Sequence, residues 1–199
     1  LSIRRQRQMC IRDRFERALK GDEDLGKLLS YGYISGEFIT DVQHGYPMLV
    51  RSVDSNFNLA NLMKTHIYSA FSTLKIGIDL LKERENIHID SMFGHGGIFK
   101  TEKVAQSFLA AALDSPVRVM QTASEGGAWG IAVLARYMIE TKTSNLATYL
   151  NDFAFKGTES MTIEPTKDEV ASFEQYTERF KQGIPLERLA HEQFNSEQK

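Results

Sequence analysis

The 199-residue sequence has one cysteine, Cys10, four prolines and five histidines. A single cysteine cannot form a disulfide within the chain, and the histidines lack the spacing of a zinc module. A disulfide framework and a structural metal site are therefore disfavoured. No apolar run approaches the roughly 20 residues that a membrane-spanning helix needs. These absences predict a soluble protein of the reducing cytoplasm, with no membrane partner.

The net charge of the whole chain is −2, but the charge is unevenly distributed. Residues 1–20 carry seven basic and two acidic residues, a net charge of +5, which leaves −7 for the remainder. An acidic body is a poor surface for nucleic acid, so the sequence predicts no nucleic-acid partner. The basic first 20 residues can be an RNA-binding arm or simply a solvated chain end, and both interpretations stay open.

The first 14 residues are predicted to lie outside the fold. The chain begins with Leu1, and residues 8–14 resemble translated sequencing adapter joined to a partial reading frame. The segment has no apolar centre, so it is not a signal peptide. We predict that residues 1–14 are non-native, that residues 15–140 form the main domain and that residues 141–199 form a loop and a helical extension.

The clearest periodic element is a helix predicted over residues 58–83. Apolar residues recur there with the i, i+3, i+4, i+7 spacing of one helical face. Its polar residues, such as Lys64 and Lys75, are predicted to form a solvated face. Residues 31–40 are predicted to be extended, and a further strand is predicted at residues 87–90.

The functional hypothesis depends on a glycine-rich bend, Gly94-His95-Gly96-Gly97, in the middle of the chain. A helix is predicted after it, over residues 101–113 with Thr101 as its N-cap, and then a buried strand at residues 117–120. Glycines let backbone amides approach a ligand, and a helix N-terminus beside them favours an anion. The order of these elements predicts a nucleotide-sized cleft at the end of a sheet.

Small residues mark the next helix, which Ser124 is predicted to cap. Its glycines and alanines are expected to let it lie close against a neighbour. Beyond residue 140 the sequence predicts a polar loop or hairpin as far as residue 162. A helix with a capping box then starts at Thr166, and it is predicted to stop at Gly183-Ile184-Pro185 before a short final helix.

Three separated motifs together resemble the C-terminal domain of the FGGY carbohydrate kinases. They are the bend from Asp90 to Gly97, the helix end Leu113-Asp114-Ser115-Pro116-Val117, and the run from Glu125 to Ala132. The sequence looks most like the xylulose kinases, with ribulose kinases next, over residues 28–140. The resemblance implies an α/β fold that is part of the C-terminal actin-like, ribonuclease H-like ATPase domain, with a helical extension at the C-terminus.

The resemblance also implies a function. Such kinases use ATP and Mg²⁺ to phosphorylate a sugar, here a ketopentose and in the first instance D-xylulose. By position, the residues that would border the adenosine are Gly94, Gly96, Gly97, Lys100 and Thr101. No catalytic residue is expected in this chain, and the resemblance leaves a homodimer open.

The sequence departs from the family pattern at two positions and lacks two motifs. Ile98 stands where the family usually has a small residue, which concerns adenine packing, and Ala112 stands where it often has aspartate. The Asp-x-Gly-Thr phosphate loop and the upstream aspartate that acts as general base have no counterpart. Because phosphoryl transfer depends on positioning all the reacting groups, this chain alone is expected to show no sugar-kinase activity.

Other interpretations of the same residues stay open. The glycine bend can be a simple turn between a strand and a helix, and the chain can be a non-catalytic α/β binding module. A dinucleotide-binding fold is disfavoured because the third glycine and the downstream acidic residue are missing. His95 is expected to bond to local backbone, and Trp129 to serve packing.

Overall fold

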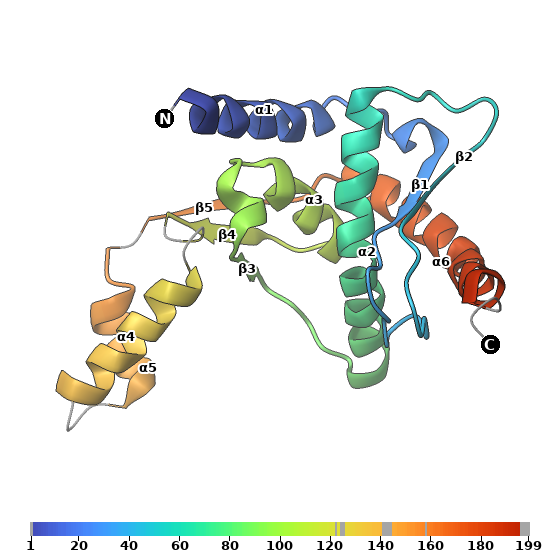
Figure 1. The fold of residues 1–199 in the computed structure, drawn as a ribbon. Helices are drawn as coiled ribbons and strands as arrows, with labels where there is room; N and C mark the ends of the chain where they lie inside the picture. Colours follow the sequence, from blue (N-terminus) through green and yellow to red (C-terminus); the bar gives the residue numbers. More distant parts are fainter. Residues whose placement is uncertain (1, 122, 124–125, 141–144, 158, 196–199) are drawn as a thin grey trace.

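The computed structural model describes residues 2–121, 123, 126–140, 145–157 and 159–195. Its first half contains α1 (Ser2–Ala18), η1 (Leu25–Lys27), β1 (Leu28–Tyr31), β2 (Met48–Arg51), α2 (Leu59–Glu85), β3 (Met92–Gly94), η2 (Gly97–Lys100) and α3 (Val104–Leu113). Its second half contains β4 (Val117–Met120), α4 (Gly126–Glu140), α5 (Leu146–Tyr149), the π-helical turn η4 (Leu150–Ala154), β5 (Ser160–Ile163) and α6 (Lys167–Asn195). The predicted α/β class is confirmed (Figure 1).

The strands form two small sheets. β1 and β2 pair antiparallel, while β4 lies between a parallel β3 and an antiparallel β5. The strand predicted at residues 117–120 is confirmed as β4. The strand predicted at residues 87–90 is wrong, because pairing begins only where the Met92 amide donates to the Pro116 carbonyl at 2.9 Å. β5 begins within the segment predicted to be a polar loop or hairpin, of which residues 141–144 and 158 lie outside the described residues.

Three helices meet at one buried tyrosine. Tyr68 of α2 is 1% exposed and stacks on Phe173 of α6 with ring centres 4.3 Å apart. It also meets Phe108 of α3 edge-on at 5.2 Å and Tyr176 of α6 edge-on at 5.5 Å. Aromatic rings of this size bury a large apolar area, so the contact fixes α2, α3 and α6 against each other.

α2 has the extent that its periodicity predicts, since Asn58 caps its first turn by accepting from the Asn61 amide at 3.0 Å. The solvated face predicted on this helix is wrong for Lys64 and Lys75, which are both buried. The Lys64 ammonium donates to the Asp22 carbonyl at 2.8 Å, and Lys75 is paired with a carboxylate one turn along. Carbonyl and carboxylate partners stabilise these buried cations, which a pattern of hydrophobicity cannot reveal.

α6 begins as predicted but does not end as predicted. Thr166 and Glu169 exchange backbone and side-chain hydrogen bonds, which confirms the capping box. The stop at Gly183-Ile184-Pro185 is wrong, because α6 continues past Pro185 to Asn195. One turn before the proline, the Tyr31 hydroxyl of β1 donates to the Phe180 carbonyl at 2.7 Å. Pro185 has no N–H to donate to the Lys181 carbonyl, and the contact with β1 is made at the neighbouring residue, Phe180.

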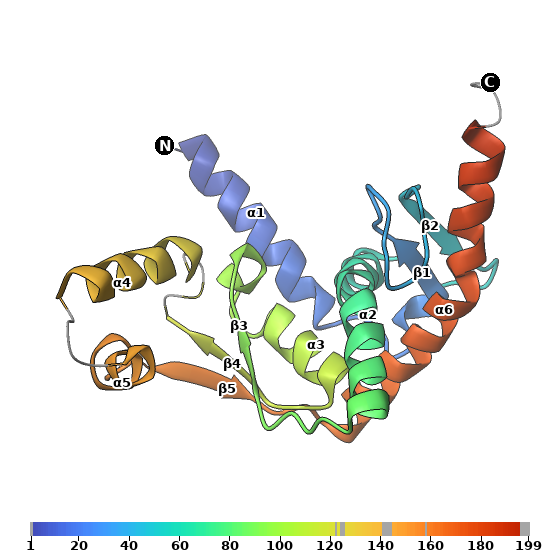
Figure 2. The same cartoon turned by 90° about the horizontal axis from the view of Figure 1, so that it is seen from below.

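One helical hairpin and most of α1 lie outside the three-helix core. Figures 1 and 2 show α4 and α5 beside each other, apart from α2, α3 and α6. Residues 1–14 were predicted to be non-native, and most of α1 is exposed until Ala18, which is buried. That prediction and the predicted domain boundary at residue 140 both stay predictions. α6, which follows this boundary, contributes Phe173 and Phe180 to the same core as α2.

We expect Gly183→Ala to destabilise the fold. A Cβ at this position would overlap the Tyr31 hydroxyl and come within 3.0 Å of Leu29 Cδ2, so β1 or α6 must shift. The free energy of unfolding should fall by about 1–3 kcal/mol in urea denaturation. The matched control is Gly77→Ala in α2, where the added Cβ meets only Ile39 at 3.8 Å. That change should raise stability by up to about 1 kcal/mol, and equal effects of the two substitutions would contradict the interpretation.

We expect Glu187→Gln to stabilise the protein at neutral pH. Burial raises the pKa of this carboxyl, and the hydrogen bond from the Tyr46 amide, at 2.7 Å, opposes part of the rise. Since the folded-state pKa lies above the unfolded one, the carboxyl favours the folded state at low pH and loses that effect as the pH rises through the folded pKa. Glutamine keeps an acceptor for Tyr46 without the buried charge.

Melting curves recorded between pH 4 and pH 8 test this expectation. The variant should melt on the order of 2–4 °C above the unsubstituted protein at pH 7, and the difference should shrink toward pH 4. Glu192→Gln, at an exposed position of the same helix, serves as the control and should change little. A lower melting temperature for Glu187→Gln at pH 7 would show that the charge itself is stabilising.

Candidate functional site

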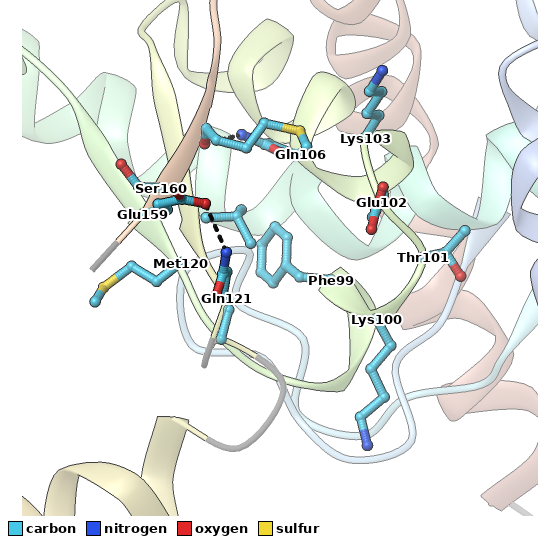
Figure 3. Close-up of a pocket in the computed structure, with 13 residues that line it drawn as sticks. Phe99, Lys100, Thr101, Glu102, Lys103, Gln106, Met120, Gln121, Glu159 and Ser160 are labelled. Atoms are coloured by element: carbon cyan, nitrogen blue, oxygen red, sulfur yellow. Dashed lines mark hydrogen bonds between the residues drawn. The ribbon is translucent and has the colours of Figure 1, made fainter. Parts of the chain in front are cut away.

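A cavity of about 520 Å³ lies where the parallel strands β3 and β4 end (Figure 3). Its walls come from η2 and the following turn, from the first turns of α3, from the end of β4 and from the start of β5. The residues that line it are Phe99, Lys100, Thr101, Glu102, Lys103, Gln106, Val119, Met120, Gln121, Ala123, Glu159, Ser160 and Met161. Ligands of α/β proteins bind preferentially outside the carboxyl ends of parallel strands.

Two of the five residues predicted to contact a nucleotide line this cavity. They are Lys100 and Thr101, whereas Gly94, Gly96 and Gly97 do not line it. The predicted role of Thr101 as N-cap is wrong, because α3 begins three residues later, at Val104. Thr101 instead ends η2, and it is only 8% exposed.

The glycines of the bend shape the turn itself. Gly96 has φ = 111°, a value that side chains rarely allow, and its amide donates to the Ala123 carbonyl at 2.8 Å. This amide is therefore engaged within the fold and does not face a ligand as the bend predicted. A Cβ on Gly94 would lie 2.7 Å from the ring carbons of Phe99. Gly94 thus makes room for an aromatic side chain.

The two residues after Gly97 divide between the core and the cavity. Ile98, which departs from the family pattern, packs against the hydrophobic core and does not line the cavity. Phe99 also contacts the core, and its ring lines the cavity as well. The space that the sequence predicts for a base is therefore not filled by Ile98.

Two glutamines connect the walls. Gln106 is 3% exposed, and its amide nitrogen donates to the carbonyls of Val117 and Met161, each at 2.8 Å. It thereby ties α3 to β4 and β5 at once. Gln121 donates to a Glu159 carboxylate oxygen at 2.9 Å on the exposed side of the cavity.

Charge of both signs surrounds the cavity. Lys100 and Lys103 contribute two cations, and Glu102 and Glu159 contribute two anions. In Figure 3 the side chains of Lys100 and Lys103 point in opposite directions, at opposite ends of the labelled group. Cationic groups near the cavity are suited to a phosphate, while the centre offers an aromatic ring.

Of its glycines, the small-residue helix lies close against a neighbour only at the first, Gly126. A Cβ on Gly126 would lie 2.8 Å from His95 Nδ1 of the glycine bend, whereas added Cβ atoms at Gly127 and Gly130 would meet no atom within 4 Å. None of the residues of α4 lines the cavity. Trp129 packs on Phe155 with ring centres 5.4 Å apart, inside the hairpin that α4 forms with α5 and η4. Ser124, the predicted cap, lies outside the described residues.

A comparison with protein-family models identifies the family. The model for the C-terminal domain of the FGGY family of carbohydrate kinases matches residues 5–139, more than half of the chain. The chain belongs to the FGGY family. No curated protein matches it in sequence.

Solved structures agree with this assignment at the level of the fold. The FGGY chain superposes on a ligand-bound xylulose kinase from Lactobacillus acidophilus with a TM-score of 0.69 and 13% identity, over 92% of this chain and 36% of that one. It superposes on a gluconate kinase from the same organism with a TM-score of 0.64 and 14% identity, over 84% of this chain and 32% of that one.

A Plasmodium falciparum glycerol kinase with ADP superposes with a TM-score of 0.60 and 14% identity, over 84% of this chain and 33% of that one. Because these neighbours are FGGY kinases, the predicted actin-like, ribonuclease H-like fold is confirmed. The FGGY chain spans about a third of the length of these structures.

Sequence reasoning missed most of the cavity wall. Phe99, Gln106 and the start of β5 carry no local signal of a site, because the pairing of β5 with β4 alone brings residues 159–161 to it. Across the described ranges, no group of three or more His, Cys, Asp or Glu could hold a metal ion. Within the same ranges no helix has the length and apolar character to cross a membrane.

We expect Gln106→Leu to destabilise the FGGY chain and to loosen the cavity. The substitution leaves two carbonyls without their amide donor in a buried place, which costs about 1–3 kcal/mol. Gln121→Leu is the matched control, because the same change there removes only an exposed hydrogen bond and should cost less than about 0.5 kcal/mol. Urea denaturation of both variants makes the comparison, and equal losses would argue against a structural role for Gln106.

Proposed function

We propose that this chain forms the nucleotide side of an ATP-dependent sugar kinase. The enzyme would transfer the γ-phosphoryl group of ATP, with Mg²⁺, to a hydroxyl of a ketopentose. The observation that carries the proposal is the cavity outside the ends of β3 and β4, lined by Lys100, Thr101 and Phe99 next to the glycine bend. The family assignment supports a kinase, and the ADP in the glycerol kinase structure supports an adenine nucleotide.

The cavity fits a nucleoside in size and in chemistry. Its volume of about 520 Å³ lies within the range of small-ligand sites, roughly 300–1,000 Å³. Phe99 and Met120 offer apolar surface for a base, while Lys100 offers a cation for a phosphate. Thr101 adds a hydroxyl from the same turn. A nucleotide would therefore be bound here by side chains. The Gly96 amide does not contribute, because it donates to the Ala123 carbonyl.

The chain's own contribution to the reaction is to bind and orient. When bound, ATP supplies the phosphoryl group that is transferred. Lys100 would hold negative charge of the phosphates at one end of the cavity, and the buried Gln106 would keep the walls in place. Phosphoryl transfer depends chiefly on such positioning and on charge stabilisation. The general base and the phosphate loop would come from other parts of the kinase.

The sugar is a proposal that rests on the resemblance. D-xylulose is the first substrate to test, because the three sequence motifs look most like those of xylulose kinases. Neighbouring structures carry the names of xylulose, gluconate and glycerol kinases, so the fold is compatible with several polyols. A ribulose kinase and a non-catalytic α/β binding module are the alternatives.

Calorimetric titration of the 199-residue FGGY chain with ADP and Mg²⁺ tests the proposal. We expect saturable binding and a melting temperature that rises with ligand concentration. Lys100→Met should weaken ADP binding about ten-fold, because it removes a charge-assisted contact with phosphate, and should leave adenosine binding unchanged. Lys20→Met, a change outside the cavity, is the control. No binding of ADP at millimolar concentration would refute the proposal for this cavity.

A further inference from the structure

Phe99 lies in the middle of the residues that line the cavity (Figure 3). Its ring comes from η2, packs against the hydrophobic core on one side and lines the cavity on the other. Figure 3 shows the ring between Gln121 and Gln106, with the Lys100 side chain extending away from it. Of the residues that line the cavity in the described part of the chain, Phe99 is the one aromatic residue.

The ring is supported from behind by backbone. Gly94, the last residue of β3, is buried, and a Cβ built on it would lie 2.7 Å from two ring carbons of Phe99 and 3.1 Å from a third. Such distances are shorter than side chains tolerate, so the ring reaches this position only because residue 94 is glycine. An aromatic face held in this way is positioned before any ligand arrives, which lowers the entropy lost on binding.

We propose that Phe99 is the platform on which the nucleoside base stacks, and that Gly94 sets the position of its ring. The inference rests on the proposed nucleotide function of this cavity. Val119, Met120 and Met161 also line the cavity and add apolar residues to its wall. Stacking depends on the π-face that all bases share, so the platform favours nucleosides over phosphate alone and tolerates different bases.

Substitutions at residue 99 test whether the aromatic face of Phe99 or only its apolar volume contributes to ADP binding. Phe99→Ala should weaken ADP binding about ten-fold or more, the loss expected when a base loses its aromatic partner. Phe99→Leu, which keeps most of the volume, should also weaken it, while Phe99→Trp should bind as the unsubstituted chain does. Pyrophosphate binding should be the same in all four proteins. Calorimetry measures the affinities, and circular dichroism confirms that each variant is folded.

Phe93→Ala is the matched control, because Phe93 lies in β3, is 52% exposed and does not line the cavity. It should leave ADP affinity unchanged. If Phe99→Ala does not fold, Phe99→Leu alone decides. Equal ADP affinity for the Leu variant and the unsubstituted chain would overturn the role of Phe99 while the proposed function stands. If the unsubstituted chain binds neither ADP nor pyrophosphate, the proposed function fails, and the stacking role fails with it.

Discussion

The contact on which the rest of the structure depends is the packing of three aromatic rings around Tyr68. Phe108, Phe173 and Tyr176 meet it from two other helices, and burial raises the pKa of the Tyr68 hydroxyl to about 12. Because α3 is fixed by this packing, its Gln106 can hold the first residues of β4 and β5. The walls of the cavity are therefore positioned by a junction that lies outside the cavity.

Elements whose signals are local could be predicted from the sequence. The 3.6-residue period of α2 gave its extent to within two residues, and the pair Thr166 and Glu169 marked the start of α6. The buried strand at 117–120 followed from its β-branched residues and the preceding proline. Each of these patterns acts through neighbours in the chain, so the sequence alone contains the physical information.

Features that depend on distant residues could not be predicted. Pro185 is a stop signal by local rules, yet α6 passes through it while β1 contacts the preceding turn through Tyr31. The sequence predicts Lys64 to be a surface residue, because nothing local shows that its ammonium donates to the carbonyls of residues 21 and 22. In the same way, only Lys100 and Thr101 of the candidate site were found from their position after the glycine bend, and the part at the start of β5 needed the antiparallel pairing with β4.

The glycine bend has a different geometry from the one that its sequence suggests. The sequence suggested bare backbone that offers amides to a ligand, but the Gly96 amide is bonded to Ala123 and Gly94 is covered by the Phe99 ring. The lack of a side chain at Gly94 does not expose backbone, because the Phe99 ring fills the space. The bend therefore brings the Phe99 ring and Lys100 to the cavity where the sequence suggested a cradle of amides, and under the proposed function a ligand would be recognised there through side chains.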